Sequence, residues 1–169
     1  MQRPHQNEFP TYFSKYIALV KGNNLHEAIQ IHEKEIIDFY NQLPNEKANY
    51  AYAPNKWSIT DVLQHVVDTE RVFTYRALIV ARKSNAILSG FDENEFATQA
   101  ALNNLQLEKL KQELIASRQS SDLFFTSLSN ETLSNVGVAN NNPITVNALG
   151  FMNLGHFLHH KNVLLERYL

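Results

Sequence analysis

A chain of 169 residues is long enough to fold as one domain with a sizeable apolar core. Hydrophobic residues make up 44% of it and charged residues 19%, which excludes both a disordered chain and a protein embedded in a membrane. A net charge of −2 with no basic stripe argues against nucleic acid as a partner. The absence of cysteine excludes disulfides, thiolate metal ligands and a cysteine nucleophile. The first ten residues lack the apolar core of a secretory signal, so a cytoplasmic protein is expected.

Spacings of three and four between apolar residues predict a first helix over residues 25–43, ending before Pro44. Asn24 is its expected N-cap, with Glu27 completing a capping box. A second helix is predicted from Ser58 to about Arg82. Ser58 is a good N-cap residue, Asp61 places negative charge in the first turn, and Trp57 is expected to pack on Val62.

The rest of the chain carries two more helical segments and two long connections. Residues 83–102 show no strong period and are expected to form a link, with Phe91 and Phe96 packed into the bundle. A third helix is predicted over residues 104–128. Residues 131–146 are expected to be a loop, because an asparagine cluster and Pro143 favour turns. Thr145 is the expected cap of a last helix that reaches about Tyr168, and the first twenty residues would form a short element packed outside.

Neither an internal repeat nor a domain boundary is visible, and no segment has the alternating pattern of a strand. Four long helices that each have an apolar face predict an all-α fold, a four-helix bundle. We expect one such domain over residues 1–169.

The seven histidines are unevenly placed, and three of them fall within GHFLHHKN near the end of the chain. On a helix, His156 and His160 lie one turn apart on the same face, a spacing that presents two nitrogens to one metal ion. A third ligand must come from another helix, and His65 is the candidate because it lies among Leu63, Val66 and Val67.

Two other interpretations of these histidines stay open at this point. A histidine on an apolar helix face is often a half-buried, hydrogen-bonded core residue. Spacing alone also fails to separate His159 from His160, since both lie near His156 on the helix surface. The sequence has no Glu after His156, which removes the zincin type of metal site.

Motifs near both ends of the predicted bundle resemble those of the DinB/YfiT-like superfamily. They are KWSI at residues 56–59, DVLQH at 61–65, DTER at 68–71, GFD at 90–92, GHFLHH at 155–160 and ERYL at 166–169. Their order is that of the family, and the resemblance covers roughly residues 10–169. The family is a four-helix bundle of metalloenzymes in which one histidine of the second helix and an HxxxH pair of the last helix bind a divalent ion. The resemblance thus implies His65, His156 and His160 as metal ligands and His159 as a neighbour.

The same resemblance implies a function. Three neutral imidazoles leave a coordination position open, which is typical of catalytic rather than structural sites. The expected ion is divalent zinc, nickel or iron, which histidine nitrogen suits alike. Family members include thiol-S-transferases and metal-dependent hydrolases, so the expected partner is a small molecule, such as a low-molecular-weight thiol. The alternatives are a non-catalytic metal-binding stress-response module and a structural bundle with core histidines. An apolar outer face would support a homodimer.

Asp68 lies three residues beyond His65 and is a candidate general base, or an acceptor that orients a ligand imidazole. A solvated or salt-bridged surface acid is an equal alternative for it. Glu70, Arg71 and Arg76 are expected to form pairs on the helix surface, with a lesser possibility that an arginine binds an anionic substrate.

Overall fold

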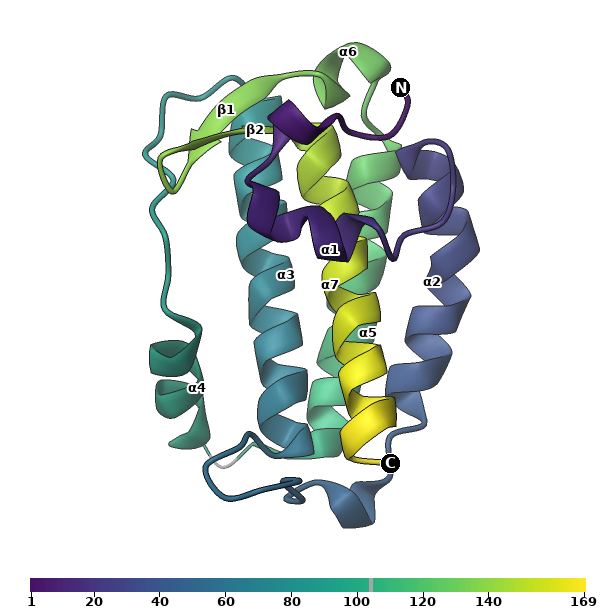
Figure 1. Ribbon diagram of the computed structural model, residues 1–169, viewed down its shortest axis with the longest axis vertical. Helices are drawn as coiled ribbons and strands as arrows, with labels where there is room; N and C mark the ends of the chain where they lie inside the picture. The colour runs from purple at the N-terminus through teal and green to yellow at the C-terminus, as the bar shows by residue number, and fades with distance from the viewer. Residues whose placement is uncertain (104) are drawn as a thin grey trace.

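Four long helices stand side by side in the computed structural model, which describes residues 1–103 and 105–169 (Figure 1). They are α2 (Leu25–Asn41), α3 (Ile59–Ala81), α5 (Leu107–Thr126) and α7 (Val146–Arg167). The predicted four-helix bundle is therefore confirmed. The predicted start of the third helix at Asn104 lies outside the described residues.

The helices are not arranged in chain order. Both α2 and α3 pack against α5 and against α7, so α2 and α3 occupy opposite corners although they are consecutive in the chain. Residues 42–58 cross beneath the bundle to connect them. This crossing makes α3 and α7 direct neighbours that run antiparallel, and it brings the two predicted histidine-bearing helices together (Figure 1).

The expected helix caps are present. The Ser58 side chain accepts from the backbone N–H of Asp61, whose carboxylate accepts from the backbone N–H of Ser58 in return. Thr145 caps α7 by accepting from the N–H of Ala148, and Asn24 caps α2. Each cap satisfies an N–H that would otherwise lack a partner at a helix start.

Shorter elements lie at both ends and along the sides of the bundle (Figure 1). They are α1 (Ser14–Ile17), α4 (Glu93–Ala101), α6 (Asn130–Leu133), β1 (Val136–Ala139), β2 (Asn142–Thr145) and the 3-10 turns Gln6–Glu8, Thr11–Phe13 and Asn45–Lys47. The expectation that residues 131–146 form only a loop was wrong. Strands β1 and β2 pair antiparallel, with Ala139 opposite Asn142, so their connection is only two residues long. Asn140 and Asn141 both have positive φ, the geometry that joins two strands tightly without splaying them.

Two expectations about side chains were also wrong. Phe96 lies on α4 and is 42% exposed, since α4 stands beside α3 and turns this residue outward. Glu70 and Arg76 are not surface residues, because both are buried on the inner faces of α3. The N-terminal segment is more than an external element: Tyr16 and Ile17 are buried, and Arg3 donates to the carbonyl oxygens of Ile17, Val20 and Gly22.

The core runs the length of the bundle, and α7 contributes the longest buried stretch, residues 146–158. In its centre the Tyr40 hydroxyl donates to the carbonyl oxygen of Phe157, which ties α2 to α7. Among the described helices, none is both long enough and apolar enough to cross a membrane.

Candidate metal centre

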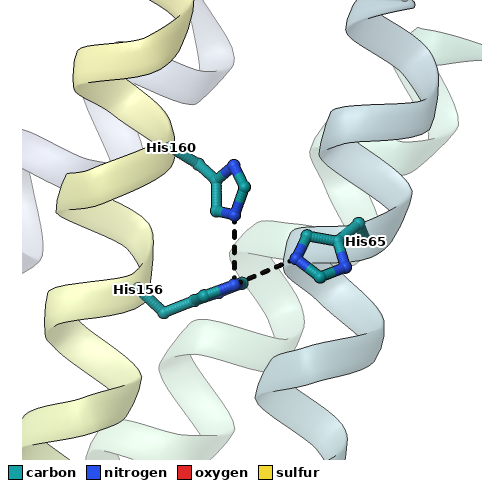
Figure 2. A group of neighbouring side chains, drawn as sticks. All are labelled: His65, His156 and His160. Atoms are coloured by element: carbon teal, nitrogen blue, oxygen red, sulfur yellow. Dashed lines mark hydrogen bonds between the residues drawn. The ribbon is translucent and has the colours of Figure 1, made fainter. Parts of the chain in front are cut away.

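His65 of α3 and His156 and His160 of α7 point toward one another across the α3–α7 contact (Figure 2). The Nε2 atom of His156 lies 3.0 Å from Nε2 of His65 and 3.1 Å from Nε2 of His160. The ligand atoms of the three residues all lie within 4.8 Å of one another. The i, i+4 spacing on α7 gives two of the rings, and the chain crossing that makes α3 the neighbour of α7 gives the third.

Hydrogen bonding alone satisfies this arrangement poorly. A neutral imidazole nitrogen either donates one proton or accepts at one lone pair. His156 Nε2 therefore forms one good hydrogen bond at most, although two ring nitrogens approach it. A cation at the centre would accept all three lone pairs at once, and nitrogens bound to one zinc ion stand roughly 3.3 Å apart. The three donor atoms thus fit a divalent metal ion better than they fit each other.

His32 provides an internal comparison, because it is a buried histidine with an ordinary structural role. Its Nε2 accepts from the backbone N–H of Lys21, and its Nδ1 lies 3.0 Å from a carboxylate oxygen of Glu35. Both nitrogens of His32 therefore have protein partners. In contrast, Nδ1 of His156 and of His160 is buried with no hydrogen-bond partner among the described residues. The cluster lacks the features of a satisfied core histidine.

Burial holds the three rings in the neutral form that a metal ion requires. Burial, followed by the nearby His159, lowers the pKa of His65 to about 4. Burial and then the surrounding histidines lower the pKa of His156 well below its ordinary value. The same two causes lower the pKa of His160. Near neutral pH the rings carry no charge, so three lone pairs are free to bind a cation.

A cavity of about 380 Å³ opens on the cluster and is lined by His65 and His156 at one end. Its walls come from α3, α7, the N-terminal segment, the GFD loop at residues 90–92 and the β1–β2 hairpin. This volume falls in the range of small-molecule sites. A second cavity, of about 260 Å³, is lined by His160 together with Trp57 and Tyr168. All three histidines therefore line a cavity, unlike the ligands of a closed structural metal site.

Trp57 and Tyr16 fix the rings from outside the cluster. The Trp57 ring centroid lies 4.9 Å from that of His65, so this residue contacts a candidate ligand, a contact that the sequence did not suggest. The Tyr16 ring contacts both His156 and His159. His159 consequently faces α1 and is not part of the converging set, which separates it from His160. Burial, followed by Tyr12 and then Glu93, raises the pKa of Tyr16 well above its ordinary value.

Close packing of α1 on α7 depends on a glycine. A Cβ atom at Gly155 would lie 2.3 Å from the carbonyl oxygen of Tyr16. No side chain fits there, because the obstacle is backbone. Gly155 of the GHFLHH motif thus allows the segment that carries Tyr16 to lie directly over His156.

Asp68 stands near the cluster but has other partners. It accepts a hydrogen bond of 2.8 Å from the Gln64 amide and lies 3.6 Å from Nη1 of Arg71. Glu70, on another face of α3, is fully buried and lies 3.0 Å from Nη1 of Arg118. Burial raises the pKa of Glu70, although Arg118 opposes this shift. Arg118 also donates to Asp122, so this buried ionic group joins α3 to α5 away from the histidines.

Further residues line the site, and of these only Tyr16 was not considered from the sequence. Tyr16 and Thr69 line the cavity, and the hydroxyl of Thr69 is buried with no partner among the described residues. Arg76 lines the same cavity. The spacing of His65, Thr69 and Arg76 was the available signal, because residues four and eleven apart share one helix face.

Comparisons with known proteins agree with this geometry. The family model of the DinB superfamily matches residues 28–164. The fold is similar to that of a solved structure described as "YfiT from Bacillus subtilis is a probable metal-dependent hydrolase with an unusual four-helix bundle topology". That similarity has a TM-score of 0.66 at 13% identity and covers 97% of this chain and 90% of that one.

The fold is also similar to a mycothiol-dependent maleylpyruvate isomerase, with a TM-score of 0.66 at 11% identity. This similarity covers 91% of this chain but only 60% of the isomerase. No curated protein matches the sequence. At these identities the two structures establish the fold alone.

Proposed function

Because the chain belongs to the DinB superfamily, we propose that it is a metal-dependent enzyme that acts on a small molecule, with His65, His156 and His160 as the ligands of one divalent ion. The observation that carries this proposal is the approach of two ring nitrogens to the single Nε2 atom of His156. A shared cation satisfies all three nitrogens at once.

A divalent ion with an open position lowers the pKa of a bound water or thiol and so supplies a nucleophile near neutral pH. The protein's own residues would admit the substrate and position it. The cavity admits a small molecule to the side of the cluster lined by His65 and His156. Trp57 holds the His65 ring in place, and the buried Thr69 hydroxyl, one turn along α3, offers the substrate a hydrogen bond. The contacts of Asp68 with Gln64 and Arg71 favour a supporting role over that of general base.

Two reactions fit this site: hydrolysis, and transfer of a substrate group to a thiol. One structural neighbour is described as a probable metal-dependent hydrolase and the other as mycothiol-dependent, which supports both. The chain has no cysteine, so in the second reaction the thiol must come from a small molecule. Zinc, nickel and iron all suit an all-imidazole set of ligands.

Two alternatives make different predictions. A structural bundle with core histidines would bind no metal, and the contrast with His32 speaks against it. A non-catalytic metal-binding module would bind the ion and turn nothing over. The cavity beside His65 and His156 favours an enzyme over this second alternative.

The decisive experiment is elemental analysis of protein purified without an affinity tag. We expect one divalent ion per chain in the wild type, and its loss in His65→Ala and in His160→Ala. His159→Ala is the matched control, since this neighbour on the same helix should leave metal content unchanged. A wild-type protein that takes up no zinc, nickel or iron(II) when these are added would refute the proposal.

Activity assays follow on the metal-loaded protein. Thiol-dependent consumption of an alkylating electrophile tests the transferase, and release of nitrophenol from an ester tests the hydrolase. Turnover should vanish in His160→Ala and persist in His159→Ala. A metal-loaded protein with neither activity across a broad panel would favour the non-catalytic module.

A further inference from the structure

The cavity beside the histidine cluster has a second polar end. His65, Thr69, Phe73 and Arg76 all line it and lie along one face of α3. Eleven residues separate His65 from Arg76, which places their Cα atoms roughly 16 Å apart on an α-helix. Helical side chains lean toward the N-terminus of their helix, so Arg76 is directed back along α3 toward the cluster.

Arg76 is a buried cation with few partners. Only 7% of the residue is exposed, yet it forms a single hydrogen bond with the described residues: Nη2 donates to the carbonyl oxygen of Ser89 at 2.6 Å. Its guanidinium also lies 5.8 Å from the centre of the Phe91 ring. An arginine side chain has five N–H donors, so most of the donors of Arg76 have no protein acceptor among the described residues.

Arg118, a second buried arginine, has the carboxylate partners that Arg76 lacks among the described residues. Arg118, which is 1% exposed, lies beside the carboxylates of Glu70 and Asp122. In the described part of the chain, no carboxylate lies within ion-pair distance of Arg76. Glu93 is the one acidic residue that lines the cavity there, but it is exposed and lies close enough to Tyr16 to raise that residue's pKa. A buried cation without a counter-ion is costly and is expected where a ligand supplies the negative charge.

The cavity walls are mainly apolar. The cavity that His65, His156 and Arg76 line is also lined by Phe13, Phe73, Phe91, Ile144 and Met152. Arg76 is the only lysine or arginine among the described lining residues, and the histidines there are neutral. Apart from the proposed metal ion, Arg76 is the single positive charge that the described residues bring to this cavity, and it matches one carboxylate. The planar guanidinium fork also matches a carboxylate.

We propose that Arg76 is the anion-binding subsite of this cavity and that the ligand is a small carboxylate with an apolar body. The inference deepens the proposed function and rests on it for the opposite end of the ligand, which would lie at the histidine cluster. The Thr69 hydroxyl, buried between the two ends, is a further donor to such a ligand.

The test compares matched ligands with and without the charge. ω-Mercaptocarboxylates of four to eight carbons are titrated into the metal-loaded protein beside ω-mercaptoalcohols of the same length, and binding is followed by calorimetry. We expect the carboxylate to bind on the order of tenfold to a hundredfold more tightly in the wild type. Arg76→Gln should abolish this preference and leave the affinity for the alcohol unchanged. Arg76→Lys, which keeps the charge without the fork, should retain part of it.

Arg82→Gln is the matched control, because Arg82 is exposed at the C-cap of the same helix and should keep the full preference. Equal affinity for the two ligands in the wild type would overturn the inference. So would an equal weakening of both ligands by Arg76→Gln, since this would mean that Arg76 only supports the loop through Ser89. Arg76→Lys gives the comparison if Arg76→Gln does not fold.

A second arm separates this inference from the proposed function. Hexanoate and 1-hexanol are titrated into metal-free wild type and metal-free Arg76→Gln, where no metal ion attracts the carboxylate. A preference for hexanoate that depends on Arg76 supports the subsite even if the protein never binds a metal. A metal-loaded protein that binds thiols without any preference for carboxylates refutes the subsite and leaves the proposed function standing.

Discussion

Acid should destabilise the metal-free protein strongly, because three histidines, of which His156 is buried and His65 and His160 are half-buried, remain neutral in the folded state. Burial lowers the pKa of His65 to about 4, and the pKa values of His156 and His160 lie well below the ordinary value. In the unfolded chain each ring has a pKa of about 6.5 and takes up a proton as the pH falls. The unfolded state therefore binds more protons than the folded state, and stability present above about pH 6.5 is lost below it.

The size of the effect follows from these pKa values. At pH 5 each ring that stays neutral in the folded state costs about 2 kcal/mol relative to pH 8, so three rings cost about 6 kcal/mol as an upper limit. A typical domain has a free energy of unfolding of about 5–15 kcal/mol. The metal-free protein should thus be close to unfolding near pH 5. The measurement is urea unfolding at several pH values between 8 and 5, with a chelator present.

The control removes two of the rings. Glu70 and Asp122 have pKa values raised by burial, so they add stability as the pH falls and oppose the histidines. The double variant His156→Leu/His160→Leu keeps these carboxyls and should show a shallower loss, by up to about 4 kcal/mol between pH 8 and pH 5. The same pH dependence in the wild type and the double variant would refute the reasoning, because the rings would then be protonated in the folded state at no cost.

Two further changes probe the packing around the site. Gly155→Ala places a methyl group against the Tyr16 backbone and should lower the free energy of unfolding in urea by about 1–3 kcal/mol. In the control Gly150→Ala, the new methyl group meets only the flexible end of a leucine side chain, so the loss should be smaller. An equal loss in the two variants would contradict this account. Arg118→Met leaves Glu70 buried without its partner and should lower the free energy of unfolding by about 3–5 kcal/mol at pH 7. The loss should be smaller at pH 5, where the Glu70 carboxyl takes up a proton. A loss under about 1 kcal/mol at pH 7 would count against the ion pair.

Local signals in the sequence predict much of the bundle. Ser58 and Thr145 cap helices as expected, because capping depends on residues within one turn. The three candidate ligands also lie together as expected. Two of them share a helix face, and His65 was the candidate for the third because of its apolar neighbours. The resemblance to a known family then separated His160 from His159.

The structure differs from the sequence-based predictions at positions where contacts between distant parts of the chain determine the conformation or burial. The hairpin was missed because each strand has only four residues, although two asparagines in succession are a signal for a two-residue turn. The burial of Glu70 depends on Arg118, forty-eight residues along the chain, which no local pattern reveals. The position of Tyr16 over His156 likewise depends on a glycine of a different helix.

The cavity walls and the candidate ligands belong to different kinds of structure. All three histidines are fixed on long helices, while much of the wall comes from the N-terminal segment, the GFD loop and the hairpin. Substitutions in those three covering segments can reshape what the cavity accepts without moving a ligand nitrogen. Apart from the residues that α3 and α7 themselves contribute, such as Arg76, much of the surface that would select the compound therefore lies on segments separate from the helices that hold the ligands, so selectivity can change among such proteins while the reactive centre stays the same.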